Sequence, residues 1–117
     1  MRCPTGAARL TPGFGLPASW VIHTVGPVWR GGAAGEPDLL AACYREALRL
    51  AAVQRLASLA FPAISCGIYG YPPEEASRIA VREARAWLAA QPAPRSILFC
   101  CFNAGIAGAW RAALAEA

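Results

Sequence analysis

With 117 residues, 56% of them hydrophobic, the chain is long enough for one domain with a single core and too apolar to be disordered. Eleven arginines and no lysine give a net charge of +4. The absence of lysine excludes a lysine-dependent phosphate loop and Schiff-base chemistry. No apolar run approaches the ~18 residues of a membrane span, and the first residues lack a signal-peptide pattern, so no membrane partner is expected.

The cysteines do not form a metal-binding pattern. There is one histidine and no C-x-x-C pair, so neither a zinc site nor any other metal or cofactor is predicted. We expect free, mostly buried thiols, which indicates a cytoplasmic protein in a reducing compartment. The five cysteines are Cys3, Cys43, Cys66, Cys100 and Cys101.

The first half of the chain predicts two strands and a helix. A short strand is expected at 8–11 and a β-branched strand at 20–25, which Gly26 and Pro27 end. Residues 29–35 are expected to form a flexible surface loop. A helix should begin near 36–37, where an acidic residue and a proline suit its first turn. Its apolar stripe comprises Leu40, Cys43, Tyr44, Ala47, Leu48 and Ala51.

The second half continues the alternation. Buried strands are predicted at 59–64 and 96–102, and helices at about 73–89 and at 105–115. The order β–α–β–α–β–α indicates one α/β domain, a largely parallel sheet covered by helices on both faces. The inward positions of the two helices are Ala76, Ala80, Ala84, Trp87, Ile106, Ala109, Trp110, Ala113 and Leu114. Arg78, Arg82 and Arg85 share a helical face preceded by acidic residues, which favours a solvated face over a nucleic-acid patch.

The loop S-C-G-I-Y-G-Y-P at 65–72 is the strongest candidate site. It follows a predicted parallel strand and precedes a helix, where α/β proteins bind phosphates. Gly67 and Gly70 let the backbone turn sharply, and successive N–H groups of such a turn can form an anion-binding nest. Pro72 and Pro73 remove donors from the helix start, and Glu74 and Glu75 repel an anion there. We therefore expect the loop amides of Cys66–Gly70, with the Ser65 hydroxyl, to hold a diphosphate.

Each of these residues also has a plainer interpretation. The loop could be an ordinary βα connection with two turn glycines. Phe102, at the same edge of the sheet as the loop, could stack on a base or belong to the core. Tyr69 could cover a ribose. Tyr71, which precedes two prolines, could instead serve simply to pack the loop against the domain.

Three segments together resemble one family. V-I-H-T-V-G-P at 21–27, F-P-A-I-S-C-G-I-Y-G-Y-P at 61–72 and I-L-F-C-C-F-N at 97–103 resemble the macro domain, and C-P-T-G-A-A-R-L-T at 3–11 fits the same group. The resemblance implies a three-layer α/β/α sandwich with a mixed sheet that binds ADP-ribose or an ADP-ribosylated protein. It also implies a ligand site made of Ser65, Cys66, Gly67, Ile68, Tyr69, Gly70, Phe102 and Asn103. His23 is expected to be structural, satisfied near the core.

The resemblance also implies what the chain lacks. In the family a catalytic asparagine lies in an N-A-A-N segment and a catalytic aspartate in G-G-G-V-D, both before the C-P-T-G region. The only asparagine and aspartate here are Asn103 and Asp38, in other contexts, so no catalytic residue is assigned. The chain therefore resembles the C-terminal two thirds of one macro domain, without its N-terminal strands. Because one of these is central, we expect a gap, or a non-native pairing, between the strands at 20–25 and 59–64.

Three hypotheses of function follow. The first is an ADP-ribose-processing enzyme, a hydrolase of ADP-ribosyl esters or a deacetylase of O-acetyl-ADP-ribose, as the resemblance to the family implies. This chain could instead bind ADP-ribose without turnover, as an inactive or unstable fragment, and self-associate through an exposed sheet edge. A remote third hypothesis is a thiol enzyme using Cys66 and His23, if the amide-lined loop lowers the pKa of that cysteine.

Overall fold

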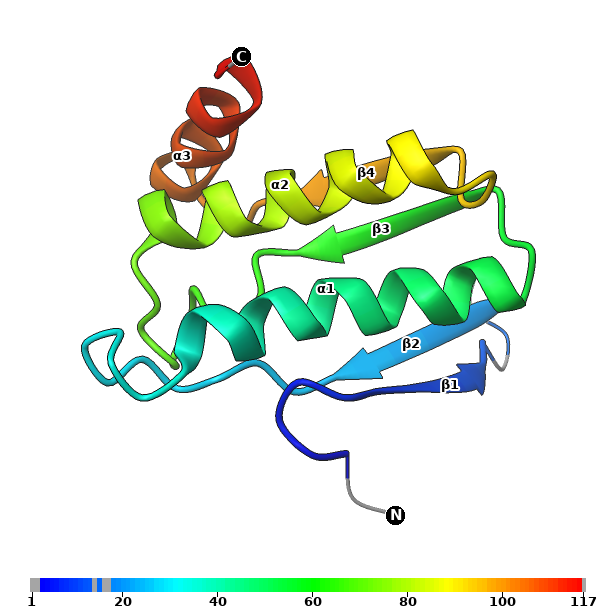
Figure 1. The fold of residues 1–117 in the computed structure, drawn as a ribbon, viewed down its shortest axis with the longest axis horizontal. Coiled ribbons are helices and arrows are strands. Elements are labelled where there is room, and N and C mark those ends of the chain that lie inside the picture. The colour runs from blue at the N-terminus through cyan, green and yellow to red at the C-terminus, as the bar shows by residue number, and fades with distance from the viewer. Residues whose placement is uncertain (1–2, 14, 16–17, 117) are drawn as a thin grey trace.

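A computed structural model describes residues 3–13, 15 and 18–116 of the chain. The elements alternate along the chain as the sequence predicts, and Figure 1 shows the strands and helices running roughly alongside one another. In chain order they are β1 (Ala8–Pro12), β2 (Trp20–Thr24), α1 (Glu36–Val53), β3 (Ser58–Pro62), α2 (Pro73–Ala90), β4 (Ser96–Cys100) and α3 (Ala104–Ala115).

The described strands form two separate pairs. β1 and β2 are antiparallel, in a register from Ala8 opposite Thr24 to Pro12 opposite Trp20. β3 and β4 are parallel, with Ser58 opposite Ser96. β2 and β3 point the same way but are not hydrogen-bonded to one another within the described residues (Figure 1). The gap expected between these strands is confirmed.

The three helices pack in one row. α2 packs between α1 and α3, and α1 also contacts β1 and β2. The predicted stripe of α1 is buried throughout, and Tyr44 lies at its centre, 4.9 Å from the Phe61 ring and 6.3 Å from the Phe99 ring. Side chains of β3 and β4 that face the helices complete this core, and Trp110 of α3 closes it at 6.2 Å from Phe99.

The opposite face of the strands is open in the described part of the chain. Along β3 and β4 every second residue is exposed, including Ala60, Leu98 and Cys100. The prediction of two fully buried strands is therefore wrong, because the described helices cover one face only. β3 also ends at Pro62 and β4 at Cys100, each two residues earlier than predicted.

Several side chains lie nearer the surface than predicted. Leu114 of α3 is 48% exposed, because α3 lies at the end of the helix row and contacts α2 with its other face. Of the five cysteines only Cys43 is buried; Cys100 is exposed and the others are intermediate. His23 is exposed on the open face of β2 instead of lying near the core, although its Nε2 does find a partner, the Thr11 hydroxyl at 2.8 Å.

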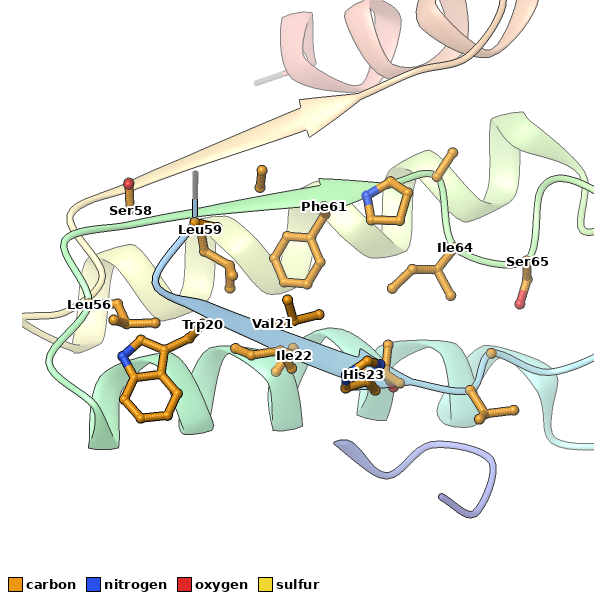
Figure 2. A pocket seen from close by; sticks show the side chains of 18 of the residues that line it. Trp20, Val21, Ile22, His23, Leu56, Ser58, Leu59, Phe61, Ile64 and Ser65 are labelled. Atoms are coloured by element: carbon orange, nitrogen blue, oxygen red, sulfur yellow. The ribbon is translucent and has the colours of Figure 1, made fainter. Parts of the chain in front are cut away.

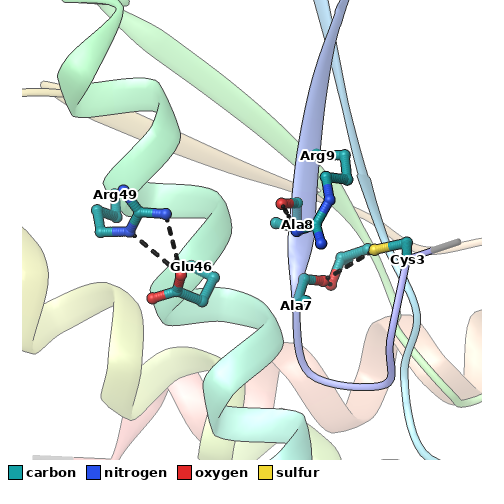
Figure 3. A network of polar contacts seen from close by, with 7 residues as sticks. Cys3, Ala7, Ala8, Arg9, Glu46 and Arg49 are labelled. Atoms are coloured by element: carbon teal, nitrogen blue, oxygen red, sulfur yellow. Dashed lines mark hydrogen bonds and ion pairs between the residues drawn. The ribbon is translucent and has the colours of Figure 1, made fainter. Parts of the chain in front are cut away.

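β1 lies beside α1 and packs against it (Figure 3). The Cys3 thiol donates to the Ala7 carbonyl at 3.4 Å, and the turn before β1 brings Gly6 so near α1 that a Cβ there would lie 3.3 Å from Leu39 Cδ2. The Arg49–Glu46 ion pair on α1 is solvent-exposed and contributes little. The N-terminal strand is thus held mainly by its pairing with β2 and by packing on α1.

Candidate ligand-binding site

The loop between β3 and α2 folds back on itself through its own backbone. The N–H of Cys66 donates to Ala63 O at 3.2 Å, that of Gly70 to Gly67 O at 3.0 Å, and that of Tyr71 to Ser65 O at 2.9 Å. The N–H groups of Gly67, Ile68 and Tyr69 have no protein acceptor among the described residues. Of the five amides expected to hold a diphosphate, these three consecutive ones are free, whereas those of Cys66 and Gly70 shape the loop.

Ser65 occupies an unusual backbone conformation at the start of this loop. Its φ of +67° lies in the left-handed region, which non-glycine residues adopt at a cost of about 1 kcal/mol or more. Its hydroxyl oxygen is buried without a partner in the described structure. The space for it is provided by Gly26, because a Cβ on Gly26 would lie 2.2 Å from Ser65 Oγ and 2.6 Å from Ile64 Cγ2. Sequence reasoning treated Gly26 only as a strand terminator and missed this close approach.

A second segment holds the loop from its other side. The N–H of Trp29 donates to Tyr69 O at 2.8 Å, and the Trp29 and Tyr71 rings lie 4.6 Å apart. Tyr71 is 2% exposed, so it packs the loop down, as one of the two interpretations proposed. Tyr69 is 41% exposed at the loop surface and remains free to contact a ligand.

Residues 29–35 have a defined conformation because Glu36 binds their backbone. Its buried carboxylate accepts from the N–H groups of Arg30 at 2.7 Å, Gly32 at 3.0 Å and Ala34 at 2.7 Å. Burial alone raises the pKa of Glu36, but the backbone hydrogen bonds outweigh it and lower the pKa to about 2. The prediction of a flexible loop is wrong. The sequence feature that indicates a held loop is Glu36, which directly follows the glycine-rich segment.

The start of α2 is poorly suited to an anion, as predicted. Pro72 is the N-cap, Pro73 is the first helical residue, and Glu74 and Glu75 lie in the first turn. An anion seated there would find few donors and two negative charges. This leaves the free loop amides as the better anion site of the segment.

The structure argues against a thiol enzyme. Burial, together with the neighbouring Cys101 and Glu74, raises the pKa of the Cys66 thiol to about 11. The prediction that the loop lowers this pKa is wrong. His23 Nε2 is hydrogen-bonded to the Thr11 hydroxyl on β1, and no hydrogen bond joins His23 to Cys66 among the described residues.

Phe102 and Asn103 lie between β4 and α3. The Phe102 ring is 66% exposed, which excludes the core interpretation. Asn103 is the N-cap of α3, and its Oδ1 accepts from the N–H of Ile106 at 2.9 Å. That oxygen therefore already caps the helix, whereas the side-chain amide nitrogen of Asn103 has no acceptor among the described residues. The contact of both residues with a base stays a prediction.

A cavity of about 910 Å³ follows the gap between β2 and β3 (Figure 2). Side chains of both strands, including Val21, Leu59 and Phe61, lie along it, and Ala47 of α1 belongs to its lining. At one end it reaches Ser65 and Tyr69. The candidate ligand loop and the gap in the sheet are thus continuous.

The part of the chain that the structure describes holds no cluster of metal ligands and no helix that could span a membrane. Its histidine, cysteine and acidic side chains nowhere gather in threes as a metal site needs. Its helices include none with the length and apolarity to cross a membrane.

The fold and the loop together define an α/β domain with three consecutive free amides in the loop that follows a parallel strand. The sequence model of the macro domain family matches residues 1–80. A macro domain-containing protein of Xanthomonas axonopodis pv. citri is 51% identical over 115 residues, which are 98% of this chain and 64% of that protein. The chain belongs to the macro domain family.

The other similar proteins carry more specific descriptions. A protein of Klebsiella pneumoniae described as O-acetyl-ADP-ribose deacetylase is 50% identical over 97% of this chain and 65% of its own length. The Trypanosoma brucei macrodomain solved in complex with ADP-ribose superposes with a TM-score of 0.86 at 40% identity, over 96% of this chain and 47% of that one. The Oceanobacillus iheyensis macrodomain solved with ADP gives a TM-score of 0.89 at 39% identity, over 95% and 58%. The chain therefore spans about two thirds of the length of these curated relatives and less of the solved structures.

Proposed function

We propose that this chain binds ADP-ribose, free or attached to a protein, with the diphosphate on the amides of Gly67, Ile68 and Tyr69. The observation that carries the proposal is the row of three free N–H groups between the internally bonded amides of Cys66 and Gly70. Consecutive free amides of such a turn can form a nest that suits an anion without any lysine. The structures of relatives with ADP-ribose and ADP support the choice of ligand.

The remaining contacts follow from exposure and position. Tyr69 is exposed beside the free amides and would cover the distal ribose, and the exposed ring of Phe102 would lie against the adenine. Asn103 would donate through its amide nitrogen, since its oxygen caps α3. Ser65 and Cys66 would shape the loop more than contact the phosphates.

Ile68 allows a backbone test of this site. Its side chain is fully exposed, so Ile68→Ala removes the side chain and keeps the N–H, whereas Ile68→Pro removes the N–H as well. A hydrogen bond to a charged group contributes about 1.5–3 kcal/mol, so Ile68→Pro should weaken ADP-ribose binding about 10- to 100-fold relative to Ile68→Ala in calorimetry. Equal affinities of the two folded variants, or no heat from the parent chain at millimolar ADP-ribose, would refute the proposal.

Hydrolysis is the second candidate function, favoured by the deacetylase description of the Klebsiella relative. The one aspartate, Asp38, lies exposed in the first turn of α1, and the one asparagine caps α3, so neither is placed to orient a hydrolytic water at the loop. We expect the chain alone to bind O-acetyl-ADP-ribose without accelerating its hydrolysis. Release of acetate by the purified chain at a rate that scales with its concentration would show that it is an enzyme.

A further inference from the structure

Glu36 holds a segment that lies outside its own helix. Its side chain is 2% exposed; Oε2 accepts from the N–H groups of Arg30 and Gly32, and Oε1 accepts from that of Ala34. Among the described residues no arginine forms an ion pair with Glu36, so backbone N–H groups compensate its charge. Burying a carboxylate is unfavourable unless it is hydrogen-bonded. Glu36 and residues 30–34, which we call the Glu36-bound loop, therefore keep one another in place.

Gly32 connects the Glu36-bound loop to the side chain of Trp29. Gly32 has a φ of +93°, and a Cβ on it would lie 2.8 Å from Cη2 of the Trp29 ring, so its backbone lies directly against the indole. Gly32 is also one of the three residues whose N–H group Glu36 binds. The carboxylate therefore holds the backbone that supports the Trp29 ring.

Trp29 makes two contacts with the candidate ligand loop. Its N–H donates to Tyr69 O at 2.8 Å, and its ring lies 4.6 Å from the ring of the buried Tyr71. Figure 1 shows the connection between β2 and α1 beside the connection between β3 and α2. Tyr69 is the last of the three residues with free N–H groups, and the N–H of Tyr71 closes the loop on Ser65 O. Trp29 thus fixes the C-terminal end of the candidate anion site.

We propose, on the basis of the proposed function, that Glu36 is a positioning residue for ADP-ribose binding. Through the Glu36-bound loop and Trp29, its carboxylate holds the three free amides of the candidate ligand loop in a conformation that binds a diphosphate. Glu36 is buried and both of its oxygens are used by the Glu36-bound loop, so it acts on the ligand through the positions of those amides. Such preorganisation raises affinity without any contact of its own.

The direction of the effect separates positioning from simple electrostatics. By charge alone, Glu36→Gln should bind the anionic ligand at least as tightly as the parent, because it removes a negative charge. Positioning gives the opposite result, since glutamine has one acceptor oxygen and its NH₂ group would face an N–H group of the Glu36-bound loop. Apparent affinity scales with the fraction of chains in the binding conformation. If that fraction falls to roughly a tenth to a third, affinity falls about three- to tenfold.

Calorimetry with ADP-ribose compares the parent, Glu36→Gln and Asp38→Asn at a temperature at which circular dichroism shows all three folded. Asp38→Asn is the matched control, because Asp38 lies exposed in the same first turn of α1 and the change removes the same charge. Weaker binding by Glu36→Gln alone supports the proposal, and equal binding by the two variants overturns it. If the parent itself binds no ADP-ribose, the proposed function fails, and amide spectra without ligand decide whether Glu36 holds the loop.

The amide signals of the folded chain, resolved residue by residue by NMR without ligand, report the positions directly. We expect Glu36→Gln to shift or broaden the signal of Trp29 and those of the three free amides, whereas Asp38→Asn leaves them in place. A loss of stability without repositioning would leave the signals of the folded state unchanged. Signals of Trp29 and of the candidate ligand loop that coincide with those of the parent would therefore overturn the proposal.

Two glycines of the Glu36-bound loop test the connection through Trp29 without changing a charge. Gly31→Ala and Gly32→Ala both place a side chain at a positive φ, +96° and +93°, so their backbone strain is similar. A Cβ on Gly31 would meet nothing within 4 Å, whereas one on Gly32 would displace the Trp29 ring. We expect Gly32→Ala to bind ADP-ribose about three- to tenfold more weakly than Gly31→Ala. Equal affinities of the two folded variants would contradict this connection.

Discussion

Replacing Gly26 by alanine should distort the ligand loop from outside it. Gly26 is buried at the end of β2, and an added Cβ would meet Ser65 Oγ at 2.2 Å and Ile64 Cγ2 at 2.6 Å. Real Cβ atoms essentially never approach other atoms below 3.0 Å, so Ser65 and Ile64 must move. Ile64 is part of the core and Ser65 is held by the bond to Tyr71, so neither can yield freely.

The magnitude follows from two opposed effects. Overpacking by one methyl group costs about 1–3 kcal/mol, whereas a Gly-to-Ala change restores about 0.4–1 kcal/mol through the unfolded chain. The net loss is about 1–2 kcal/mol, which lowers the Tm of a chain of this length by roughly 4–8 °C. Because Ser65 carries the loop amides with it, ADP-ribose affinity should fall as well.

Urea denaturation followed by circular dichroism measures the stability, and calorimetry measures the binding. Gly67→Ala is the matched control for stability, because its Cβ would meet no atom within 4 Å and its φ is not in the left-handed region. The double variant Gly26→Ala with Ser65→Gly should recover part of the loss, since it removes the hydroxyl and suits the φ of +67°. If Gly26→Ala is as stable as the parent and binds ADP-ribose equally, the loop is not held by this contact.

Two further predictions concern side chains that bind backbone N–H groups. Because the pKa of Glu36 in the folded chain is about 2, below its ordinary 4.5, its stabilising contribution is full above about pH 4.5 and is lost as the pH falls toward 2. Measurements of Tm at decreasing pH should show this loss. Glu36→Gln should lower Tm at pH 7 and remove that part of the pH dependence. If Tm of the variant falls with pH as steeply as Tm of the parent, the prediction is contradicted. Asn103→Ala should lower the free energy of unfolding, measured by urea denaturation, by about 1 kcal/mol, because it removes the cap of α3. Asn103→Asp keeps the acceptor and should be nearly as stable as the parent. Equal losses in both variants would rule out the cap.

Local patterns in the sequence were enough to predict the helices. The stripe from Leu40 to Ala51 is buried along its whole length, and Ala76, Ala80 and Ala84 face the core as expected. A helix carries its own backbone hydrogen bonds, so a 3.6-residue period in the sequence is sufficient to locate it. The loop after β3 was likewise predicted, because its glycines and prolines act on the backbone locally.

Burial of the strands could not be predicted in the same way. Leu98 and Cys100 are as apolar as residues of a covered strand, yet they are exposed because the described helices lie on one face. Coverage of a strand depends on which elements pack against it, and these come from distant segments. The pattern of α3 also predicted Leu114 to face inward. It is exposed because α3 lies at the end of the helix row, a position that the local pattern does not show.

No local pattern in the sequence predicts the gap in the sheet. It was expected from the family resemblance alone. Trp20–Thr24 has the β-branched composition of an ordinary strand, and Ser58–Pro62 is a short, mostly apolar segment. The composition of neither segment indicates that the facing edges of β2 and β3 are not hydrogen-bonded to one another.

The gap also gives a physical reason to expect that ADP-ribose binding and hydrolysis would separate in this chain. The free amides of Gly67, Ile68 and Tyr69 belong to one continuous segment that closes through its own hydrogen bonds and through Gly26 and Trp29, so the loop is formed while the gap between β2 and β3 is open. A hydrolytic water, in contrast, must be oriented by side chains from a second wall facing the loop. Ser65 and Tyr69 line one end of the cavity between β2 and β3, so a strand that filled the gap in a longer chain would bring its own residues beside the loop. Adding the unmatched third of the Xanthomonas relative should therefore change hydrolysis of O-acetyl-ADP-ribose far more than it changes ADP-ribose affinity, and an equal effect on both would show that the loop itself depends on the strand.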